Sequence, residues 1–137
     1  MIRPLSLTAI LLSRFGLAAG YLSSIVDRFG GWGRPGTPGV AWGDFQHFVV
    51  RVEALSPTPA LLAPILAWLI TVLEAVFGLS LLIGLRTRTM GLGSAGLLLL
   101  FAAATAMSPG GIHALFASSI LSAAGASMLL ALRAGDV

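Results

Sequence analysis

No residue between Thr89 and Leu132 carries a formal charge, and only His113 and a turn signal at 108–111 (SPGG) interrupt the apolar pattern there. A soluble domain normally has about a quarter of its residues charged. The whole chain of 137 residues is 57% hydrophobic and 9% charged, which leaves too few charges to cover a water-facing surface. The sequence therefore predicts a protein embedded in a lipid bilayer.

The apolar segments divide into four candidate spans, each long enough for a helix to cross about 30 Å of hydrocarbon. We expect spans at residues 5–26, 59–85, 89–107 and 112–132, within a single domain covering residues 1–137. A cleaved signal peptide is the alternative for the first segment. Arg14 argues against it, because it divides a region that should be uncharged.

The long loop between the first two spans has two parts. Glycines and prolines between residues 30 and 39 predict an irregular segment, and residues 45–55 form an amphipathic pattern that Asp44 can cap as a helix. We expect this helix either to lie at the level of the lipid headgroups or to pack as a lid on the bundle. The expected apolar face consists of Phe45, Phe48, Val49, Val52 and Leu55. The predicted fold is thus an all-α, four-transmembrane-helix bundle whose first loop contains a short amphipathic helix.

The placement of arginines indicates the orientation. The side of the bundle with both termini carries Arg3, Arg86, Arg88 and Arg133, whereas the long loop carries Arg28, Arg34 and Arg51. Arginines close to helix ends favour the cytoplasmic side. We therefore expect both termini in the cytoplasm and the long loop outside.

Two opposite charges inside the spans are the main candidates for a site. Arg14 lies ten residues, about 15 Å, from the inner start of the first span, and Glu74 lies eleven residues, about 16 Å, from the inner end of the second. Antiparallel helices would bring them level, and a charge in mid-membrane costs about 2.5–3.5 kcal/mol unless it is compensated. We therefore predict an intramembrane ion pair, with Thr71 and Ser122 near the same depth and with Tyr21 and Trp68 as aromatic walls.

Three interpretations of this predicted pair stay open. It could simply fasten the first span to the second. Alternatively, it could organise a polar pocket that binds the head of a lipid-soluble molecule such as a quinone, and a proton relay is a third possibility.

A second group of candidates lies on the outer face. It consists of Asp27, Arg28, Trp32, Trp42, Asp44 and His47. The aromatic residues around them are typical of an interfacial aromatic belt, and the alternative is the mouth of a ligand pocket. These aromatic residues are Tyr21, Phe29, Trp32, Trp42, Phe45 and Phe48. A metal site made by His47, His113 and Asp44 is conceivable, but we expect isolated histidines and no metal.

The composition excludes several other chemistries. The chain has no cysteine, which removes disulfides, cysteine-ligated zinc and iron–sulfur clusters. Electrons in any redox role must therefore pass through something that the protein binds. The basic residues are scattered, so no nucleic-acid partner is expected.

Several stretches, in this order, resemble the DoxX-like family of small bacterial membrane proteins. They are Arg14-Phe15-Gly16-Leu17, Asp27-Arg28-Phe29-Gly30-Gly31-Trp32-Gly33, Ala41-Trp42-Gly43-Asp44-Phe45, Glu74 in mid-span, and Gly78-Leu79-Ser80-Leu81-Leu82-Ile83-Gly84-Leu85-Arg86-Thr87-Arg88. The resemblance implies a four-helix protein of the bacterial inner membrane. Some relatives are subunits of a thiosulfate:quinone oxidoreductase, and more distant ones act as assembly factors.

Together these observations predict a membrane subunit that accommodates a quinone or a lipid and supports a partner oxidoreductase, without being catalytic alone and without a covalently bound cofactor. The alternative is a non-enzymatic scaffold or assembly factor in which the Arg–Glu pair is only structural. A small transporter is the third interpretation, and it becomes more attractive if the protein forms a homodimer.

Overall fold

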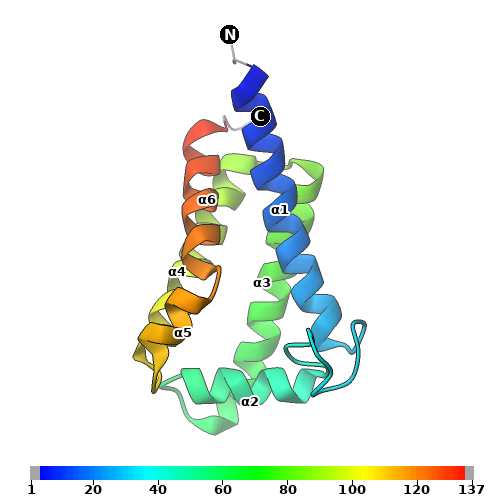
Figure 1. The fold of residues 1–137 in the computed structure, drawn as a ribbon, viewed down its shortest axis with the longest axis vertical. Coiled ribbons are helices and arrows are strands. Elements are labelled where there is room, and N and C mark those ends of the chain that lie inside the picture. The colour runs from blue at the N-terminus through cyan, green and yellow to red at the C-terminus, as the bar shows by residue number, and fades with distance from the viewer. Residues whose placement is uncertain (1–3, 135–137) are drawn as a thin grey trace.

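A computed structural model describes residues 4–134, and every regular element in that range is a helix. The elements in chain order are α1 (Pro4–Arg28), α2 (Phe45–Leu55), the 3-10 turn η1 (Ala60–Leu62), α3 (Ala63–Ile83), α4 (Thr87–Met107), α5 (Gly111–Ala117) and α6 (Ile120–Arg133). The start of α1 and the end of α6 lie at one end of the molecule, and α2 lies across the opposite end (Figure 1). Arg3, which contributes to the orientation argument, lies outside the described residues.

Three stretches of the described chain are long and apolar enough to cross a membrane. They cover Leu7–Arg28, Ala60–Ile83 and Thr87–Met107. The protein has a fourth candidate span only if α5 and α6 are counted together, and these two helices meet at a bend of 57°. The span predicted over residues 112–132 is therefore divided into two helices, and the four-span arrangement is confirmed only in part.

The break between α5 and α6 lies at two consecutive serines. Ser118 has extended backbone angles and ends α5, and its hydroxyl donates to the carbonyl of Leu115 at 2.8 Å. The chain then turns, and the carbonyl of Ser119 accepts the first bond of α6 from the amide of Ala123. Serine hydroxyls that satisfy freed carbonyls are a known cause of helix kinks.

Small residues let α4 and α6 pack closely. A Cβ atom added at Gly91 would lie 3.2 Å from both the Cβ of Ala131 and the carbonyl oxygen of Ser127. The Ser127 hydroxyl donates to the Gly91 carbonyl at 2.9 Å. Such small-residue contacts and interhelical hydrogen bonds are typical of helices that pack within membranes.

The amphipathic helix occurs as predicted, over residues 45–55. The Asp44 carboxylate caps α2 by accepting the amide of His47 at 2.8 Å. The buried side chains of α2 are Phe48, Val49 and Val52, which form one cluster with Ala63 and Ala67 of α3. The helix therefore packs against the end of α3, and Figure 1 shows it closing that end of the bundle.

Candidate functional site

A buried ion pair joins the end of α1 to the middle of α3. Nη1 of Arg28 lies 2.5 Å from Oε2 of Glu74, and the exposed fractions of the two side chains are 2% and 5%. An unpaired charge in such surroundings would cost several kcal/mol. The two charges therefore stabilise the contact between α1 and α3 by neutralising each other.

Arg28 makes three further contacts with its guanidinium. It donates to the hydroxyls of Thr71 at 3.0 Å and Ser24 at 3.1 Å, and it lies 3.6 Å from the ring centroid of Phe48. A guanidinium over an aromatic ring is attracted by the ring's negative face. Because Phe48 belongs to α2, this one side chain links three helices.

The predicted pair of Arg14 and Glu74 is wrong, since the carboxylate is occupied by Arg28. Arg14 instead donates to the carbonyl of Leu82 at 3.4 Å, and its guanidinium lies over Gly84 at the end of α3. Leu82 is eight residues beyond Glu74, a rise of about 12 Å along a helix. The depth comparison failed because α1 starts beyond the end of α3, as Figure 1 shows.

Thr71 and Tyr21, two of the remaining ligand candidates, lie in the bundle interior. Thr71 takes part in the ion-pair cluster through Arg28. The Tyr21 hydroxyl lies 2.6 Å from the Ser94 hydroxyl of α4, and both residues are buried. Tyr21 thus joins α1 to α4 by a hydrogen bond.

The other two ligand candidates lie elsewhere. Ser122 is exposed on α6. Trp68 is 52% exposed, and its ring packs against Phe45 with centroids 4.6 Å apart. The six predicted ligand residues therefore do not line one pocket.

Asp27, next to the ion pair, holds the glycine-rich loop in place. Its buried carboxylate accepts the backbone amides of Ala41 at 2.9 Å, Trp42 at 3.0 Å and Gly43 at 3.4 Å. Gly43 has a φ of +75°, and a Cβ atom there would lie 2.3 Å from the backbone nitrogen of Pro35. The carboxylate and the glycine together fix how the chain returns from α1 to α2.

The other outer-face candidates also stabilise local structure. The Trp32 indole donates to the carbonyl of Ser23 at 3.0 Å, and the Trp42 ring packs edge-on against Phe48 with centroids 5.3 Å apart. His47 Nδ1 lies 2.8 Å from Oδ1 of Asp44. The backbone amide of His47, followed by its side chain, lowers the pKa of Asp44 by hydrogen bonding to the ionised carboxylate.

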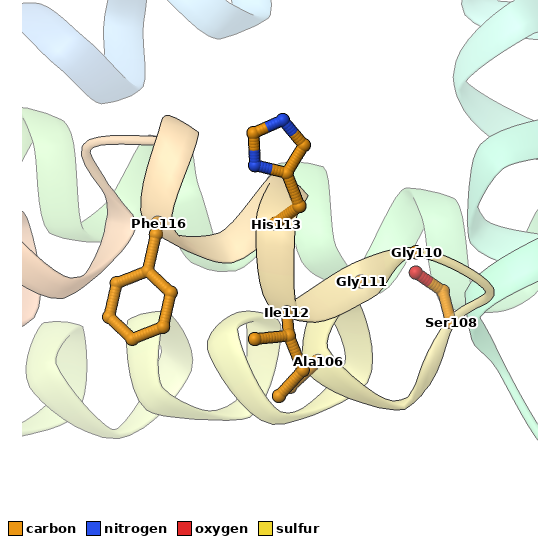
Figure 2. A pocket seen from close by; sticks show the side chains of 7 residues that line it. All are labelled: Ala106, Ser108, Gly110, Gly111, Ile112, His113 and Phe116. Atoms are coloured by element: carbon orange, nitrogen blue, oxygen red, sulfur yellow. The ribbon is translucent and has the colours of Figure 1, made fainter.

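The described residues have one further feature, an open hollow at the turn between α4 and α5. Figure 2 shows Ile112 and Phe116 on one side of α5 and the His113 ring on the other. The hollow is lined by Ala106, Ser108, Gly110, Gly111, Ile112, His113 and Phe116. Within residues 4–134, no three His, Asp or Glu side chains come together as a metal site would require.

Three partners in these contacts are absent from the sequence-based candidates. Ser24 lies four residues before Arg28, one helical turn away, so its spacing could have indicated the contact. Phe48 was expected on the apolar face of α2 without a cationic neighbour. Ser94 had no signal, because it is one of many small residues in an apolar stretch.

One comparison with known proteins gives a match. A family model described as methylamine utilisation protein MauE matches residues 6–111. This match supports a multi-pass membrane protein, but it does not identify the DoxX-like family in particular. No curated protein and no solved structure matches the chain.

Proposed function

Since the chain belongs to the methylamine utilisation protein MauE family, we propose that it is an accessory membrane protein of methylamine utilisation. In this role it supports a partner oxidoreductase as a scaffold and is not catalytic itself. The family match supports the membrane role and the pathway. The mode of action is our inference from the interior of the bundle.

The observation that carries the scaffold proposal is the linkage made by Arg28. One guanidinium contacts Glu74 and Thr71 of α3, Ser24 of α1 and Phe48 of α2. The two charges therefore neutralise each other inside the protein, at the end of the bundle that α2 closes. Such a linkage fixes α2 relative to the spans and so gives a partner a rigid surface at that end.

The experiment replaces the chromosomal copy in the host and measures growth on methylamine. It compares Arg28→Met, Glu74→Leu and the double variant Arg28→Met/Glu74→Leu, with Arg34→Gln in the exposed loop as the control. Membrane levels of the protein and co-purification of an oxidoreductase are measured in parallel. Arg34→Gln is expected to behave as the wild type in all three measurements.

The scaffold proposal predicts that each single variant lowers both the amount of the protein in the membrane and growth on methylamine. The double variant should restore both. An apolar pair of similar volume can replace a buried ion pair, whereas one unpaired charge cannot remain buried. A double variant that is present at wild-type level and still abolishes growth would contradict the scaffold proposal. It would indicate that the charges themselves act on a ligand or a proton.

Quinone binding is the second candidate function. Its support is the set of polar groups in the interior: the Tyr21 and Ser94 hydroxyls and Oε2 of Glu74, which contacts Arg28 without accepting a hydrogen bond. A quinone carbonyl needs a hydrogen-bond donor such as the Tyr21 hydroxyl. Extraction of protein purified in mild detergent, followed by chromatography with ultraviolet detection, tests this candidate. We expect quinone bound to the wild type and less in Tyr21→Phe, and equal amounts in both would reject Tyr21 as the contact.

A further inference from the structure

Positive charge is concentrated at the end of the molecule where α1 starts and α6 ends. We call this the arginine end, and within the described residues it consists of Arg14, Arg86, Arg88 and Arg133. None of the four takes part in an ion pair with a described residue. The acidic side chains that the structure describes are Asp27, Asp44, Glu53 and Glu74, and they lie in the bundle interior or toward the end closed by α2.

Arg14 is the innermost member of the arginine end. It is half-buried between α1 and the end of α3, and its one hydrogen bond to a described residue is the long contact with the Leu82 carbonyl at 3.4 Å. Its Nε atom is buried and has no partner among the described residues. A guanidinium carries five N–H donors, so most of the hydrogen-bonding capacity of Arg14 has no partner among the described residues.

The turn between α3 and α4 places two more arginines near Arg14. The Arg14 guanidinium lies over Gly84, where an added Cβ atom would be 2.8 Å from Nη1. Arg86 follows two residues later with a left-handed φ of +43°, and it precedes the first residue of α4. Arg88 is the second residue of α4, and the side chains of Arg86 and Arg88 are both exposed.

Exposed apolar side chains lie directly beside these arginines. Ile83 is 72% exposed and Leu85 is 52% exposed on the α3–α4 side, and Leu132 is 70% exposed beside Arg133. In a bilayer, such side chains contact acyl chains, and the phosphate groups of the lipids lie just beyond them. This arrangement favours a lipid over a soluble anion or an acidic protein segment as the occupant.

We propose that the arginine end binds the phosphate group of an anionic phospholipid, with Arg14 as the inner contact and Arg86 and Arg88 as the outer ones. Guanidinium groups suit phosphate because they donate paired hydrogen bonds. Basic pockets between spans at the cytoplasmic surface are typical sites for anionic headgroups. The proposal also favours the cytoplasmic side for this end.

The test measures lipid binding to the full-length protein by native mass spectrometry and by the midpoint of thermal unfolding in detergent. The probes are phosphatidylglycerol, phosphatidylcholine and inorganic phosphate. The variants are Arg14→Gln, Arg14→Lys and Arg86→Gln/Arg88→Gln, and Arg34→Gln removes the same charge from the exposed loop at the opposite end. The outer double variant alters only exposed side chains, so it decides the outcome if Arg14→Gln fails to fold.

We expect phosphatidylglycerol to bind and to raise the unfolding midpoint, and phosphatidylcholine to do neither. Each arginine lost from the arginine end should weaken phosphatidylglycerol binding about five-fold, whereas Arg34→Gln should leave it unchanged. Arg14→Lys should weaken binding less than Arg14→Gln, because lysine keeps the positive charge but lacks the paired N–H donors of the guanidinium.

Three results would overturn the proposal. Equal binding of both lipids would remove the role of the anionic charge, and equal loss in Arg34→Gln would remove the role of this particular end. If inorganic phosphate stabilises the protein as strongly as phosphatidylglycerol, the site is one for a soluble anion and not for a lipid.

Discussion

Replacing Arg28 with methionine tests the interpretation of the bundle interior most directly. The change leaves Glu74 buried without its counter-charge and removes the contacts with Thr71 and Phe48. Breaking a buried pair by removing one partner costs about 3–5 kcal/mol, and we expect Arg28→Met to fall in this range. Arg14→Met should cost only about 1 kcal/mol, since Arg14 is half-buried and makes one long hydrogen bond within the described part of the chain.

The assay is equilibrium unfolding of the purified protein in mixed micelles, with a rising fraction of dodecyl sulfate and helix content followed by circular dichroism. Two double-mutant cycles are compared. In the cycle of Arg28→Met with Glu74→Leu, the double variant should regain most of the stability lost by the single variants, because no charge remains unpaired. In the cycle of Arg14→Met with Glu74→Leu, the effects should add within about 0.5 kcal/mol.

The reasoning would be refuted if Arg14, and not Arg28, showed the coupling to Glu74. It would also be refuted if Arg28→Met cost no more than Arg14→Met. Either result would mean that Arg28 does not compensate the buried carboxylate.

Three further predictions concern the loop, the cap of α2 and the contact between α4 and α6. Gly43→Ala should destabilise the protein by about 1–3 kcal/mol, because the residue has a positive φ and its new Cβ would overlap the backbone of Pro35; Gly36→Ala, also at positive φ but in open space, should cost less in the same unfolding assay. The pKa of Asp44 is lowered by its hydrogen bonds with His47, so the stabilisation from this cap is fully present above the unfolded pKa of about 4 and is lost as the pH falls through the lower folded pKa. The amide resonance of His47 should shift in that acid range, and a titration midpoint of this resonance at or above about pH 4 would contradict the prediction. Gly91→Val should separate α4 from α6, since even its Cβ would be only 3.2 Å from the Ser127 carbonyl oxygen; a loss of about 1–3 kcal/mol is expected, and an unchanged unfolding midpoint would show that this contact is not close.

The amphipathic helix was predictable because its signals are local. Asp44 precedes the apolar pattern at the position where a carboxylate can cap, and the structure has α2 at Phe45–Leu55. Phe48 and Val52 lie one turn apart, so their burial on one face followed from the helical period. Composition was similarly sufficient to predict an all-helical membrane protein.

The ion pair was not predictable from depth alone, because depth depends on where each helix begins relative to its neighbour. The sequence offered two arginines in α1 for one carboxylate in α3. The sequence places Arg28 on the outer face, because it follows the last apolar residues of the helix. A side chain on a helix points toward the N-terminus, and this direction takes the Arg28 guanidinium back into the bundle to reach Glu74.

The break in the last apolar segment had only a faint signal. No glycine or proline lies between residues 112 and 124, and apolar residues continue on both sides of Ser118 and Ser119. Whether such a serine pair bends a helix depends on the neighbours that compete for its carbonyls, which the sequence does not specify. The choice of family was ambiguous for a related reason, since apolar motifs are shared among small membrane proteins.

The position of Arg28 has a consequence for how the protein is made. The ribosome releases Arg28 well before Glu74, so the first helix reaches the bilayer while its last residue has no counter-charge. We expect the Arg28 guanidinium to stay at the level of the lipid headgroups until α3 has inserted and Glu74 lies beside it. The glycine-rich segment would adopt its folded conformation only then. Insertion of the first helix and maturation of the loop would thus be separate events, ordered by the distance along the chain between two side chains.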